Sequence, residues 1–147
     1  MADGNPEHQE TVSAAETEQA GVRLAGTLAP GDVVLVSGDL GAGKTTLVRG
    51  ALRALGVTEA VTSPTFVVGL LYDGDRSRVA HLDLYRLDGL DDEDPGLLDA
   101  YFGHDVITFV EWPERAGGGA LPGSRPVAAR VSLAHGGGDR RRIGISR

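Results

Sequence analysis

The chain contains the stretch Gly38-Asp39-Leu40-Gly41-Ala42-Gly43-Lys44-Thr45, which matches the phosphate-binding pattern GxxxxGK[ST] at every fixed position. In this pattern the glycines let the backbone turn, so that consecutive N–H groups point at phosphate oxygens. Lys44 is the only lysine of the chain, and we expect its ammonium to reach the β- and γ-phosphates. Thr45 is placed to ligate the Mg²⁺ that accompanies a nucleotide. The stretch therefore predicts a P-loop that binds a nucleotide.

The segments on both sides of this loop have the character that a P-loop requires. Residues 33–36 are a short apolar run bounded by Pro, Gly and Asp, which is typical of a buried parallel strand. Residues 45–55 place apolar side chains at helical spacing, and Gly56 follows them. Strand, loop and helix occur in the expected order, which favours a true P-loop over a chance match.

The rest of the chain predicts a mixed sheet. A capping-box sequence at 13–16 predicts the start of a helix, and the acidic run at 91–95 predicts a short helix through residue 101. Strands are expected at 67–72, 78–85, 106–110, 126–133 and 140–146. Short turns join the first two and the last two of these strands, so each pair is expected to form an antiparallel hairpin. The fold class is α/β: a P-loop NTPase with a central, mostly parallel sheet, antiparallel hairpin additions and flanking helices.

Length and composition restrict the function classes. With 147 residues, the chain is expected to form a flexible tail over 1–10 and a single domain over 11–147. No apolar run approaches the roughly 20 residues of a membrane span, and the polar N-terminus and absence of cysteine favour a cytoplasmic protein. The formal charge of −7 argues against a broad DNA- or RNA-binding surface. If a nucleic acid is involved, we expect another protein to hold it.

Two acidic residues at the ends of apolar strands are candidates for the chemistry of ATP hydrolysis. Glu111 follows the strand at 106–110, where an acid that assists the metal is expected, and Asp83 lies at the end of the strand at 78–85. One would help to hold Mg²⁺ and the other would position the attacking water, but the sequence leaves the assignment open. Thr65 could sense the γ-phosphate or could only build a turn. Trp112 could lie beside the nucleotide or in the core.

The remaining polar candidates carry less information. His81 and His104 lack the spacing of metal ligands, and neither receives a role. Residues 140–142 are three consecutive arginines, which most often form a solvated strand edge. One of these arginines could instead lie near the base of the nucleotide or near a partner.

Four sequence motifs together resemble the TsaE (YjeE) family of small bacterial P-loop ATPases. They are the P-loop continued to Thr46, Ser63-Pro64-Thr65-Phe66, His81-Leu82-Asp83-Leu84-Tyr85-Arg86-Leu87 and Val110-Glu111-Trp112-Pro113-Glu114. The resemblance implies a component of the machinery that makes N6-threonylcarbamoyladenosine in tRNA, acting with a TsaB–TsaD pair and meeting tRNA only through that complex. It implies ATP and Mg²⁺ as cofactors, with ATP hydrolysis resetting the complex between turnovers.

The resemblance also assigns roles to particular residues. Thr45 and Glu111 are implied to hold the metal. The implied catalytic residues are Lys44, Thr65, Asp83 and Glu111, with Thr65 as a switch residue. The implied nucleotide contacts are Thr17, Asp39, Leu40, Gly41, Ala42, Gly43, Lys44, Thr45, Thr46 and Trp112.

Two other classes of function are weighed against this one. A small P-loop kinase usually has an arginine-rich lid, whereas the arginines between Gly56 and Gly117 are few and scattered. The sequence does not exclude a module that binds a nucleotide without hydrolysing it. A guanine-reading switch with an Asn-Lys-x-Asp motif is excluded, because the only asparagine is Asn5 and the only lysine is Lys44.

Overall fold

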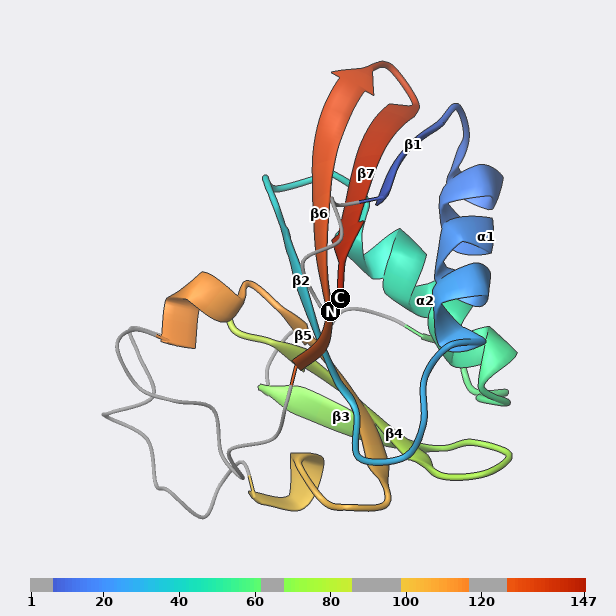
Figure 1. Ribbon diagram of the computed structural model, residues 1–147, viewed down its shortest axis with the longest axis vertical. Coiled ribbons are helices and arrows are strands. Elements are labelled where there is room, and N and C mark those ends of the chain that lie inside the picture. Colours follow the sequence, from blue (N-terminus) through green and yellow to red (C-terminus); the bar gives the residue numbers. More distant parts are fainter. Residues whose placement is uncertain (1–6, 62–67, 86–98, 117–126) are drawn as a thin grey trace.

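The computed structural model describes residues 7–61, 68–85, 99–116 and 127–147 (Figure 1). Within these residues, seven strands form one sheet in the order β1-β7-β6-β2-β5-β4-β3. The strands are β1 (Glu7–Thr11), β2 (Val33–Gly38), β3 (Gly69–Asp73), β4 (Arg78–Asp83), β5 (Val106–Glu111), β6 (Val127–Gly137) and β7 (Arg140–Ser146). The helices are α1 (Ala14–Ala25) and α2 (Lys44–Ala54), with short 3₁₀ turns η2 (Asp99–Tyr101) and η3 (Pro113–Ala116). None of these helices is long and apolar enough to span a membrane.

The centre of the sheet is parallel and its margins are antiparallel. Strands β6, β2, β5 and β4 run parallel to one another. At one margin β3 pairs with β4, and at the other β7 pairs with β6 and β1 with β7, all antiparallel. The parallel strands β2 and β5 are apolar and buried on both faces, as strands between two layers require. The predicted fold class and both predicted hairpins are confirmed.

Helices α1 and α2 lie side by side on one face of the sheet (Figure 1). Their backbones touch where they cross: a Cβ atom added to Gly21 would lie 2.0 Å from the carbonyl oxygen of Leu47, and one added to Gly50 would lie 2.0 Å from that of Glu18. Only glycine fits at both positions. This close crossing places the first turns of α1 beside the loop at the start of α2.

The N-terminal boundary of the domain differs from the prediction. Residues 7–10 were expected in a flexible tail, but they belong to β1, which pairs with β7 from Glu7↔Ile145 to Thr11↔Arg141. The segment is polar and mostly exposed, because an edge strand is held by main-chain hydrogen bonds and needs few apolar side chains. Helix α1 ends at Ala25, and Leu28 lies beyond it. Residues 1–6 and most of the predicted helix at 91–101 lie outside the described residues.

Candidate functional site: the P-loop and its acids

The P-loop joins β2 to α2 and leaves the start of α2 open. Gly43 is the N-cap residue, with φ 99°, a left-handed conformation that glycine adopts without strain. It has no side chain that could accept from the first N–H groups of the helix. These groups and the positive end of the helix dipole therefore face outward, which is the arrangement that binds phosphate.

Lys44 lies folded over the loop from which it starts. Its Nζ donates to the carbonyl oxygens of Gly38 at 2.7 Å and Asp39 at 2.8 Å. The same ammonium lies 4.2 Å from the centroid of the Trp112 ring. Two carbonyls and an aromatic face thus satisfy the cation, and a phosphate would compete for it with a full negative charge.

Burial lowers the pKa of the Lys44 ammonium below its ordinary value. Four carboxylates oppose this shift, in the order Glu111, Asp83, Glu114 and Asp39. The desolvation of the charged form is the larger effect. The site therefore holds a cation that gains from the arrival of negative charge.

Thr45 and Glu111 meet at the carboxyl end of the parallel strands. The Thr45 hydroxyl contacts both carboxylate oxygens of Glu111, at 3.1 Å to Oε1 and 3.0 Å to Oε2. Glu111 is only 2% exposed and is the last residue of β5. A hydroxyl and a carboxylate are oxygen ligands of the kind that Mg²⁺ prefers, so the pair fits a magnesium ion bound beside nucleotide phosphates.

Asp83 lies opposite Glu111 on the neighbouring strand β4. Its Oδ1 accepts from the backbone N–H of Tyr85 at 3.0 Å, and its side chain lines the same cavity as Glu111. The two acids that the sequence singled out are therefore adjacent. Which of them positions the water remains a prediction.

A cavity of about 280 Å³ opens over the P-loop at the carboxyl edge of the sheet, the usual place for a ligand in such folds. It is lined by Leu40, Gly41, Gly43, Lys44, Thr45, Thr46, Asp83, Glu111, Trp112 and Arg141. A smaller cavity of about 60 Å³ continues from it and is lined by Ala14, Thr17, Gly43, Thr46, Asp139 and Arg141. The two share three residues, so together they form a path from the acids to the first turn of α1.

The structure brings most of the predicted site residues to this path. Thr17 lines the smaller cavity, and its hydroxyl is 2.7 Å from that of Thr11. Ala42 is fully buried beneath the loop, and Asp39 contributes its carbonyl to Lys44. Thr65 lies outside the described residues, so its role stays a prediction.

Trp112 follows Glu111 with an unusual backbone. Its φ of 59° is positive, which is uncommon for a bulky residue and tends to occur at functional sites. Its N–H donates to the carbonyl of Val36 at 3.2 Å, and its ring lies 4.9 Å from that of Tyr85. The indole lies over Lys44, so Trp112 forms a wall of the cavity while it also packs against the smaller core cluster.

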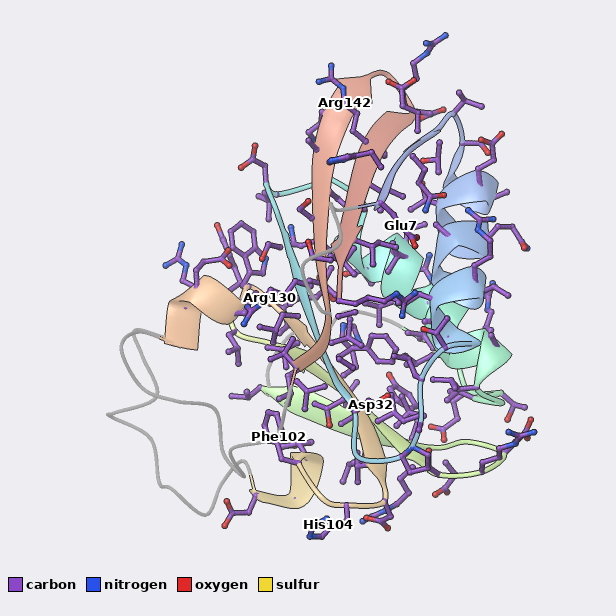
Figure 2. The ribbon with its side chains drawn as sticks, viewed as in Figure 1. Glu7, Asp32, Phe102, His104, Arg130 and Arg142 are labelled. Carbon is purple, nitrogen blue, oxygen red and sulfur yellow. The ribbon has the colours of Figure 1, made fainter. Side chains whose placement is uncertain are left out.

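Arg141 is one functional candidate that the sequence left undecided. Its guanidinium donates to the carbonyls of Gly138 at 2.7 Å and Arg140 at 2.8 Å, and approaches that of Gly41 at 3.4 Å. It lines both cavities, whereas Arg142 is exposed near the upper end of the β6–β7 hairpin (Figure 2). Of the three consecutive arginines, Arg141 is thus the one at the site.

His81 is a site residue that the sequence analysis missed. It is fully buried, and its Nε2 bonds Oε2 of Glu111. His104 is exposed beside η2 at the other end of the molecule from Arg142 (Figure 2). No spacing in the sequence links residue 81 to residue 111, because only the pairing of β4 with β5 brings them together.

A larger cavity, of about 540 Å³, lies between the ends of α1 and α2 and the β3–β4 turn. Its lining is mainly apolar, with Asp75, Arg76 and Ser77 as its polar members. It shares no residue with the P-loop cavities. Volume alone would favour this cavity as the binding site, but the acids and the phosphate-binding loop line the smaller P-loop cavity.

The sequence matches that of a known protein family. The sequence profile of a family described as "Threonylcarbamoyl adenosine biosynthesis protein TsaE" matches residues 11–143. A protein named "tRNA threonylcarbamoyladenosine biosynthesis protein TsaE" from Synechocystis is 46% identical over 102 residues, which cover 67% of this chain and 65% of the relative. The protein of the same name from Streptomyces coelicolor is 50% identical over 99 residues, which cover 65% of this chain and 66% of the relative. The matched segments thus span just under two thirds of both relatives.

A solved structure agrees with the fold along nearly the whole chain. The crystal structure of Bacillus subtilis YdiB superimposes with a TM-score of 0.72 at 31% sequence identity, covering 96% of this chain and 85% of YdiB. The family profile runs from the last residue of β1 into β7 and includes the P-loop and both helices. The chain belongs to the TsaE family.

Proposed function

We propose that this chain is a Mg²⁺-dependent ATPase of the cytoplasmic machinery that makes N6-threonylcarbamoyladenosine in tRNA, and that it acts with a TsaB–TsaD pair. The observation that supports the ATPase best is the contact of Thr45 with Glu111 directly below the open end of α2. This contact joins a phosphate-binding helix start to a carboxylate that can assist a metal. The family membership supports the role in tRNA modification.

In this proposal the chain's own groups bind and orient the nucleotide. The N–H groups at the start of α2 bind phosphate oxygens, and Lys44 exchanges the carbonyls of Gly38 and Asp39 for the β- and γ-phosphates. Thr45 and Glu111 hold Mg²⁺, which neutralises charge on the phosphates when bound. The nucleoside extends past Thr46 toward Thr17, along the path that the two cavities form.

Hydrolysis needs a water molecule aimed at the γ-phosphorus. The water oxygen forms the new P–O bond while the bond from the γ-phosphorus to the bridging oxygen breaks, which yields ADP and inorganic phosphate. With Glu111 assigned to the metal, Asp83 on the neighbouring strand is the carboxylate proposed to orient the water and to accept its proton. Arg115 lies over the rings of Trp112 and Tyr85, at 5.9 and 5.3 Å. We further propose that partner proteins complete the site.

The net charge supports an indirect relation to tRNA. A chain with a formal charge of −7 is repelled by a polyanion, whereas a partner complex can hold the RNA. ATP turnover in this chain would then reset that complex between rounds.

The test is phosphate release from ATP by the purified chain, first alone and then with its own TsaB–TsaD pair and tRNA. We expect weak release alone and strong stimulation with the partners. Vigorous release that ignores the partners would contradict the role in the complex, and transfer of phosphate to a small acceptor would point to a kinase.

Glu111→Ala and Lys44→Ala separate metal-assisted hydrolysis from binding. Glu111→Ala is expected to lower Mg²⁺-dependent release about 100-fold or more while ATP still binds. Lys44→Ala is expected to abolish tight binding. An equal loss of binding in both variants would count against this division of roles.

A further inference from the structure

We propose that His81 is a positioning residue, which holds the Glu111 carboxylate in the orientation that serves the metal. The inference rests on the proposed Mg²⁺-dependent function and assigns a role to a side chain outside the nucleotide cavity. His81 is 0% exposed, and its Nε2 bonds Oε2 of Glu111. The same carboxylate contacts the Thr45 hydroxyl through both of its oxygens. Glu111 is therefore held from two sides.

The sheet explains why these side chains meet. In the parallel pairing of β4 with β5, His81 is opposite Phe109 and Asp83 is opposite Glu111. Side chains alternate between the faces of a sheet, so residues 79, 81 and 83 of β4 share a face with residues 107, 109 and 111 of β5. Val79, Ile107 and Phe109 pack in the core beneath α1 and α2, which places His81 and Glu111 on that face, toward Thr45 at the start of α2.

The hydrogen-bonding chemistry favours one form of the imidazole. An ionised carboxylate only accepts, so Nε2 must donate to Glu111. Nδ1 of His81 is buried and has no hydrogen-bond partner among the residues that the structure describes. A proton on Nδ1 would be buried without an acceptor, which costs more than a bare lone pair. The geometry thus favours a proton on Nε2, where it is donated to Glu111.

The role follows from what the proposed function asks of Thr45. When its hydroxyl turns to Mg²⁺, Glu111 loses the donor that holds it from the side of α2. The bond from His81 does not depend on this exchange. It keeps the buried carboxylate aimed at the metal, as residues behind metal ligands commonly do.

Three substitutions distinguish positioning from packing. His81→Leu removes the donor and fills the core with an apolar side chain. His81→Gln keeps an N–H donor close to the position of Nε2, whereas His81→Asn places its amide near the position of Nδ1, too far from Glu111. If His81 only packs, Gln and Asn should behave alike.

The readout is the Mg²⁺ concentration that gives half of the maximal change in Trp112 fluorescence, measured at saturating ADP. Trp112 is the only tryptophan of the chain, and its ring lies against Lys44. We expect His81→Leu and His81→Asn to raise this concentration about 10-fold or more. His81→Gln is expected to stay within roughly threefold of the unmodified chain, and ADP affinity in EDTA should change less than twofold in all variants.

Each outcome bears on one claim. Unchanged Mg²⁺ requirements in folded His81→Leu and His81→Asn would overturn the positioning role, and so would equal defects in the Gln and Asn variants. Thermal unfolding identifies any variant that does not fold. If His81→Leu does not fold, the comparison of His81→Gln with His81→Asn decides whether His81 is a positioning residue. If the unmodified chain binds Mg²⁺–ADP but releases no phosphate from ATP, the ATPase proposal fails while the role of His81 is still tested.

Discussion

The two helices on the sheet begin in opposite ways. At the start of α1, Ser13 Oγ accepts from the N–H of Glu16 at 3.2 Å, and the Glu16 carboxylate accepts from the N–H of Val12 at 3.1 Å. At the start of α2, Gly43 offers no side chain and Lys44 brings a positive charge to a positive helix end. One helix start is completed by its own sequence, and the other is completed only by an anion. The difference separates a structural helix from a binding helix.

The largest effect should come from removing the cation of the open helix start. Lys44→Ala is expected to weaken ATP binding about 100-fold or more, roughly 3 kcal/mol, because charge-assisted bonds to phosphate are lost. Titration of Trp112 fluorescence with ATP measures it. Arg53→Ala is the matched control, since it removes one positive charge from the exposed end of the same helix. Similar losses in both variants would show that α2 binds through its general charge.

A smaller effect is expected at the completed helix start. Ser13→Ala should lower the free energy of unfolding by about 1 kcal/mol, because an N–H of α1 loses its acceptor. Urea denaturation measures the change. Ser13→Asp keeps an acceptor and should retain stability, and neither variant should alter ATP affinity more than about twofold. A large affinity loss in Ser13→Ala would mean that the two starts are not independent.

The smallest effect is a pH dependence of ATP affinity. Burial holds the pKa of free Lys44 below its ordinary value, and bound phosphates would raise it again. The bound state then keeps its proton to higher pH, so affinity should be constant at low pH and fall as pH rises through the pKa of free Lys44. The measurement is ATP affinity between roughly pH 7 and 10, a range that lies below the ordinary pKa of lysine. An equal decline in Lys44→Arg would contradict it, since a guanidinium does not deprotonate there.

Local signals in the sequence were enough for much of the fold. The P-loop pattern, the apolar strands and the hairpin turns each lie within a few residues, and they placed β2, α2, β5 and both hairpins correctly. Strand β1 was missed because its polar sequence shows no alternation, and its stability comes from main-chain pairing with a strand more than a hundred residues away.

The site was predictable to the extent that its residues belong to motifs. Asp83 and Glu111 could be singled out because each ends an apolar strand. His81 could not, since a lone histidine in an apolar strand usually belongs to the core, and only the strand register shows that it reaches Glu111. Arg141 was one of three equivalent arginines until the hairpin set its direction toward the P-loop.

The crossing of α1 and α2 limits which mutations the chain can accept. Gly21 and Gly50 lie outside the P-loop and outside the acid-bearing strands, yet an added methyl group at either would overlap a backbone carbonyl of the other helix. A carbonyl held in a helix cannot turn aside as a side chain can, so the helices would have to separate. Because α1 brings Thr17 to the nucleotide path and α2 brings the phosphate-binding loop, that separation would widen the path itself. Two residues without side chains thus set the width of the site.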